Sequence, residues 1–97
     1  MANGKTQISI SGNETKQHPI PDIDREYIKR IAATAKGMRI SAGHSYEQFA
    51  IHAGINRNSY FRFEKSAQTG DNYTVALLLK VIRGLNLTTS EFFQSIK

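Results

Sequence analysis

The residues that decide the fold lie between positions 45 and 65, where the chain reads SYEQFAIHAGINRNSYFRFEK. Ser45 can cap a short helix, and Gln48 stands at the position that completes a capping box. Gly54 can end that helix, because glycine takes the positive φ that a tight reversal needs. Asn56 can then cap a second helix. Two short helices joined by such a turn predict a helix-turn-helix.

The second helix of this motif has a basic side and an apolar side. At about 100° per residue, an arc of roughly 140° collects the cationic and amide side chains together with one phenylalanine. These are Arg57, Asn58, Phe61, Arg62 and Lys65. Arginine can bind guanine O6 and N7 in the major groove, and asparagine suits adenine. We therefore expect Arg57, Asn58, Phe61 and Arg62 to contact DNA bases, with local packing as the alternative for Phe61.

Before the motif, the apolar period is that of one long helix. Apolar residues from Ile28 to Met38 recur at helical spacing. This predicts a helix with a cap at Asp22 or Asp24 that ends near Ile40.

After the motif, two further helices are expected. The motif's second helix should end at Glu64 or Lys65, and a polar loop follows over residues 66–72. Thr74 can cap a fourth helix, and Asn86 suits the left-handed position at its end. Thr88 opens a last helix with another capping box. The chain is thus predicted to be all-α with five helices.

The ends and the composition bound the remaining possibilities. The helical domain spans residues 24–97, and the polar segment 1–23 before it is expected to be a flexible tail or a short strand around Ile8 and Ile10. The 97 residues carry a net charge of +5 and a pI near 9.8, which favours an anionic partner. The longest apolar run, Val75–Leu79, is far too short for a membrane span, and a cytoplasmic location is expected.

The pattern from Tyr27 to Phe93 resembles the Cro/repressor-type helix-turn-helix family, also called the XRE type. The matching residues are Ala50, Gly54, Ile55, Arg57, Ser59, Arg62 and Glu64, followed by the segments Asn72–Val75, Leu78–Lys80 and Leu87–Phe92. The resemblance implies a five-helix, lambda-repressor-like domain that regulates transcription. It also implies an ion pair between Arg39 and Glu64. Two positions depart from the pattern: Tyr46 replaces a phosphate-binding glutamine, and Tyr60 replaces a small branched residue.

Phosphate contacts and a dimer surface complete the expected interface. Candidates for phosphate binding are hydroxyls, amides and one lysine at the start of the first motif helix, on the second, and in the loop: Ser45, Tyr46, Ser59, Lys65, Ser66, Gln68 and Asn72.

Related domains often dimerise through their last helices. The apolar residues expected there are Leu77, Val81, Phe92, Phe93 and Ile96. The alternative is that the last helix simply covers the fourth.

Other functional classes find little support in the sequence. There is no cysteine, and His18, His44 and His52 lack metal-ligand spacing, so neither a metal nor a cofactor is expected. The serines have no partners for nucleophilic catalysis, so the protein is not expected to be an enzyme. We expect sequence-specific binding of double-stranded DNA, as a repressor and as a homodimer on a palindrome. One alternative is an antitoxin that also binds a toxin protein through its tail, and another is an assembly adaptor.

Overall fold

The computed structural model describes residues 19–96, and within them it contains helices and no strand. The elements are α1 (Asp22–Ser41), α2 (Tyr46–Ala53), α3 (Arg57–Thr69), α4 (Val75–Gly84) and α5 (Thr89–Gln94). The all-α prediction with five helices is confirmed for this part of the chain. Residues 1–18 of the expected tail lie outside the described residues. Residues 22 and 23, also assigned to that tail, belong instead to α1.

The first helix starts differently from the expectation. Its N-cap is Pro21, which makes no side-chain cap hydrogen bond, so neither Asp22 nor Asp24 is the cap. Both aspartates lie in the first turn, where a carboxylate interacts favourably with the positive end of the helix dipole. The two acidic residues therefore stabilise the start of α1 by charge and not by capping.

The other four helices have the predicted caps. Ser45 and Gln48 form the capping box of α2, and Thr88 forms the one of α5. At α3, the side-chain oxygen of Asn56 accepts a hydrogen bond from the backbone N–H of Asn58 at 2.9 Å. Thr74 caps α4 in the same way. These caps satisfy backbone donors that the first turn leaves free, so they fix where each helix starts.

The second helix of the motif, α3, is longer than predicted. It continues beyond Lys65 to Thr69 and ends at Gly70, whose φ is +72°. The Arg25 guanidinium, from α1, donates a hydrogen bond to the Gly70 carbonyl at 3.2 Å. A cation at the carboxyl end of a helix also opposes the negative end of its dipole. The prediction of an end at Glu64 or Lys65 is wrong, because a residue distant in sequence supports the last turn.

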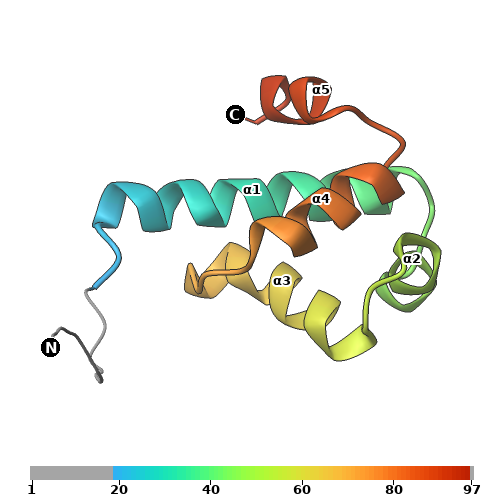
Figure 1. The fold of residues 1–97 in the computed structure, drawn as a ribbon, viewed down its shortest axis with the longest axis horizontal. Helices are drawn as coiled ribbons and strands as arrows, with labels where there is room; N and C mark the ends of the chain where they lie inside the picture. The colour runs from blue at the N-terminus through green and yellow to red at the C-terminus, as the bar shows by residue number, and fades with distance from the viewer. Residues whose placement is uncertain (1–18, 97) are drawn as a thin grey trace, which may run out of the picture.

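The core lies where α1, α3 and α4 meet the motif helix α2. Helix α1 packs most extensively on α3, and in Figure 1 α2 and α3 lie below α1 while α5 lies above it. Aromatic rings form a continuous series within the core: Phe49 to Tyr60 at 5.1 Å between centroids, Tyr60 to Phe63 at 5.8 Å, and Phe63 to Tyr73 at 4.7 Å. This series accommodates a large tyrosine at position 60, which is completely buried.

Part of the expected dimer surface is inside this core. Val81 and Phe92 have no exposed area, so they cannot form an intermolecular contact. Phe92 is a residue of α5 and Val81 a residue of α4, and these two helices pack on each other, as the alternative interpretation of the sequence anticipated. Leu77 and Ile96 are half-buried, and Phe93 is 38% exposed. Phe93 is therefore the one side chain of the expected set that presents a large apolar area to the outside.

None of the helices in the described part of the chain has both the length and the apolar composition that a membrane crossing requires.

Candidate nucleic-acid interface

The outer face of α3 carries the side chains expected to contact bases. Arg57, Asn58, Phe61 and Arg62 are all exposed, and Lys65 is exposed on the following turn. The inner face carries Tyr60 and Phe63, both buried. The two-sided character expected from the helical wheel is therefore present, and the cationic groups stand on a helix whose other face is fixed in the core.

An aromatic contact links this outer face to the start of α2. Phe61 is 50% exposed, and its ring centroid lies 6.0 Å from that of Tyr46. The Lys65 ammonium lies 5.9 Å from the Phe61 centroid, within the range of a cation–π interaction. Phe61 thus has local partners and an open area at the same time. Tyr46, where the resembled family often has glutamine, supports this ring.

Arg57, the first residue of α3, is paired with a residue in the first turn of α2. One of its terminal nitrogens lies 3.0 Å from a carboxylate oxygen of Glu47, on α2. The Tyr46 hydroxyl and the Glu47 carboxylate both raise the pKa of Arg57, the hydroxyl contributing more. The side chains of this outer pair are 66% and 50% exposed, so the guanidinium remains accessible to a ligand.

A second arginine–glutamate pair fixes α3 from the inside. The Arg39 Nε donates to one oxygen of Glu64 at 2.6 Å, and its Nη2 donates to the other at 3.0 Å. The remaining nitrogen of Arg39 donates to the His44 carbonyl at 2.6 Å, in the turn before α2. The pairing raises the pKa of Arg39, and the two side chains are only 10% and 12% exposed. The pair that the family resemblance implied is present in the structure.

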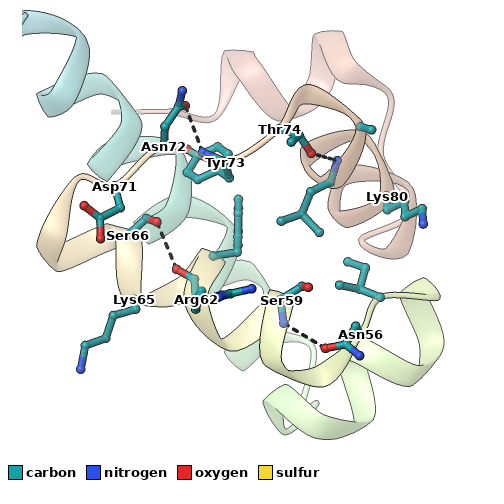
Figure 2. A pocket seen from close by; sticks show the side chains of 14 residues that line it. Asn56, Ser59, Arg62, Lys65, Ser66, Asp71, Asn72, Tyr73, Thr74 and Lys80 are labelled. Carbon is teal, nitrogen blue, oxygen red and sulfur yellow. Dashed lines mark hydrogen bonds between the residues drawn. The ribbon is translucent and has the colours of Figure 1, made fainter. Parts of the chain in front are cut away.

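A cavity of about 650 Å³ lies between α3 and α4, beside the outer face (Figure 2). Arg62, Lys80, Ser59 and Asn72 are among the residues that line it. The Asn72 side-chain oxygen accepts a bond from the backbone N–H of Tyr73 at 3.0 Å, which leaves its amide N–H groups free to donate. The cavity wall therefore offers cations and neutral donors, the groups that bind phosphate oxygens, together with one carboxylate, Asp71, which does not.

Two of the expected phosphate contacts are placed differently. Ser66 belongs to α3 and not to a loop, is 2% exposed, and donates its hydroxyl proton to the Arg62 carbonyl at 3.1 Å. With its proton used and its surface covered, Ser66 is not placed to hold a phosphate, so this expectation is wrong. Gln68 lies in the last turn of α3, where it is exposed.

Ser45 lies where the sequence predicts it, at the start of α2. It is exposed, and its hydroxyl oxygen accepts a hydrogen bond from the backbone N–H of Gln48 while its own proton stays available.

Three residues of the region were not singled out from the sequence. Glu47 pairs with Arg57, Lys80 lines the cavity, and Arg25 supports the carboxyl end of α3. Lys80 and Arg25 lie on other helices, so no local pattern indicates their role. Glu47 lies in the first turn of α2 and Arg57 in the first turn of α3, so their pairing also depends on how the two helices pack.

Comparison with known proteins adds one structural relative. No protein-family model matches the sequence, and no curated protein matches it significantly. Among solved structures, the chain is similar to the restriction-modification controller protein C.Esp1396I, whose crystal structure holds a tetramer in complex with its natural 35 base-pair operator. The similarity covers 71% of this chain and 87% of that one, at 20% sequence identity and a TM-score of 0.63. The chain thus has the helix-turn-helix fold found in that controller protein.

Proposed function

We propose that this protein binds double-stranded DNA sequence-specifically and regulates transcription, with α3 in the major groove. The observation that carries the proposal is the outer face of α3: exposed arginines on a helix that the Arg39–Glu64 pair fixes to α1. A rigid helix with two guanidinium groups suits the reading of guanine edges. The similarity to a controller protein solved on its operator supports the same conclusion.

In this proposal the residues around α3 hold the DNA backbone. Ser45, at the start of α2, offers a hydroxyl proton, and the first backbone N–H groups of α2 add the positive end of the helix dipole. Lys65, Asn72 and Lys80, which line the cavity between α3 and α4, would bind further phosphates. Such contacts set the register of the protein on the duplex, whereas Arg57 and Arg62 select the sequence.

We further propose that the protein is a repressor that acts as a homodimer on a palindromic operator. Among the residues expected at the dimer surface, Phe93 on α5 is the most exposed, at 38%, and it supports this proposal. Two copies related by a twofold axis would read half-sites about one helical turn apart, roughly 34 Å. Phe93→Glu should give a folded monomer in sedimentation that binds a palindrome poorly. A monomeric wild-type protein both with and without DNA would contradict the dimer.

Selection of binding sites from random double-stranded DNA tests the proposed function. We expect an enriched sequence with two related half-sites, and an affinity that falls steeply with salt because phosphate contacts release counterions. Failure to enrich any sequence, with weak binding even at low salt, would contradict the proposal.

A further inference from the structure

The contact between Arg57 and Glu47 has no evident value for stability. Its closest atoms are 3.0 Å apart, yet both side chains are at least half exposed. Exposed ion pairs contribute little to folding, because water screens the charges and both side chains lose freedom. The pair nevertheless places the Glu47 carboxylate in contact with the guanidinium of Arg57, the first residue of α3.

A carboxylate in this position affects two kinds of DNA contact differently. A free guanidinium binds any phosphate, and therefore any sequence. Next to Glu47, a phosphate approaching Arg57 meets a like charge and competes with a partner already bound. The edge of a guanine carries no full negative charge and needs two N–H donors, for O6 and N7. A guanidinium has five N–H groups, so one can stay with Glu47 while others bind the base.

We propose that Glu47 is a specificity-determining residue: it orients Arg57 toward a base edge and weakens the binding of Arg57 to phosphates of unselected DNA. This inference rests on the proposed DNA-binding function. Discrimination then comes partly from a repulsive element that penalises the wrong ligand, in addition to the attraction of the right one.

Glu47→Gln tests the proposal, because glutamine keeps the size of the side chain and an acceptor oxygen but loses the charge. Affinity is measured for the selected site and for random-sequence DNA over a series of salt concentrations. We expect affinity for random DNA to rise roughly three- to tenfold, with a salt slope steeper by about one phosphate contact. Affinity for the selected site should rise less, so the ratio of the affinity for the selected site to the affinity for random DNA falls.

Glu26→Gln is the matched control, since it makes the same change in net charge at an exposed position on α1. It should change binding to both DNAs equally. In an Arg57→Ala background, Glu47→Gln should no longer alter the ratio, because the two residues act together. A Glu47→Gln protein that behaves like the Glu26→Gln control while wild type still selects a sequence would overturn the role of Glu47 alone. A wild type that selects no sequence would overturn the proposed function and this role with it.

Discussion

The two faces of α3 contain the same chemical pair in opposite surroundings. On the inner face Arg39 binds Glu64 through two parallel hydrogen bonds, and about nine-tenths of each side chain is covered. On the outer face Arg57 touches Glu47 through one nitrogen, and both side chains face water. Burial gives the inner pair a structural role, because removing one partner would leave the other charge buried without its counter-charge. Exposure leaves the outer guanidinium free to exchange its partner for a ligand.

The largest expected effect is on stability, at the inner pair. Arg39→Ala leaves the Glu64 carboxylate buried without its counter-charge, which should lower the free energy of unfolding by about 3–5 kcal/mol. The contact to the His44 carbonyl is lost as well. Urea denaturation followed by circular dichroism measures the change.

If Arg39→Ala does not fold at all, Arg39→Lys keeps the comparison usable. Lysine retains the charge but cannot make the two parallel bonds, so an intermediate loss is expected. Arg57→Ala, at the outer pair, should leave the denaturation midpoint unchanged. Equal midpoints for the Arg39 and Arg57 variants would show that burial does not separate the two pairs.

The next effect is on DNA binding, at the outer face. Arg57→Ala should reduce affinity for the selected site roughly ten- to hundredfold and relax the preference at one base pair. Lys65→Ala is the control from the same face: it should weaken binding to every sequence and lower the salt slope by about one. Fluorescence anisotropy with single-base variants of the site measures both. Uniform loss across all sequences for Arg57→Ala would mean that this arginine binds only phosphate.

A smaller effect on stability is expected at Gly70, the residue that ends α3. Its φ of +72° is strained for any residue with a Cβ, and that atom would also clash with the Arg25 side chain. Gly70→Ala should therefore destabilise the protein by about 1–2 kcal/mol. Gly37→Ala is the opposite control, because Gly37 lies inside α1 with open space around it and should gain about 0.5–1 kcal/mol. Thermal melts that rank the two variants in the reverse order would contradict the proposed end of α3.

The smallest effect separates two tyrosines that both pack near the Phe63 ring, the buried Tyr60 and the partly buried Tyr73. The Tyr73 hydroxyl donates to the Ile28 carbonyl at 2.9 Å, whereas the buried Tyr60 hydroxyl has no hydrogen-bond partner among the described residues. Burial raises the pKa of both phenols. Tyr73→Phe should lose about 1 kcal/mol of stability, and Tyr60→Phe should lose nothing or gain up to about 1 kcal/mol. A marked loss in Tyr60→Phe would indicate that its hydroxyl is satisfied in solution.

The features that the sequence predicts correctly are local ones. Ser45, Asn56, Thr74 and Thr88 identify four helix starts, because a capping side chain reaches backbone N–H groups only two or three residues away. The period of 3.6 residues likewise separates the outer from the inner face of α3. The Arg39–Glu64 pair was expected only through the family resemblance, since a separation of 25 residues leaves no local signal.

The features that the sequence misses depend on contacts between distant helices. The polar residues after Lys65 predict a loop, whereas in the structure Arg25 from α1 supports the continuation of α3 to Thr69. The same local pattern predicts Ser66 at the surface, but its hydroxyl donates to the Arg62 carbonyl within the helix and the residue is buried. Val81 and Phe92 are apolar in either environment, and only the position of α5 decides that they are core residues and not an interface.

Methylation interference on the selected DNA site tests most directly whether α3 reads the major groove. Guanine N7 lies in the major groove and adenine N3 in the minor groove, so methyl groups on these atoms block different approaches. We expect methylation of guanine N7 within two half-sites to prevent binding by the wild-type protein, and methylation of adenine N3 at their centres to have little effect. In the Arg57→Ala protein, interference at one guanine of each half-site should disappear. Interference from minor-groove methylation alone, or from neither, would contradict major-groove reading by α3.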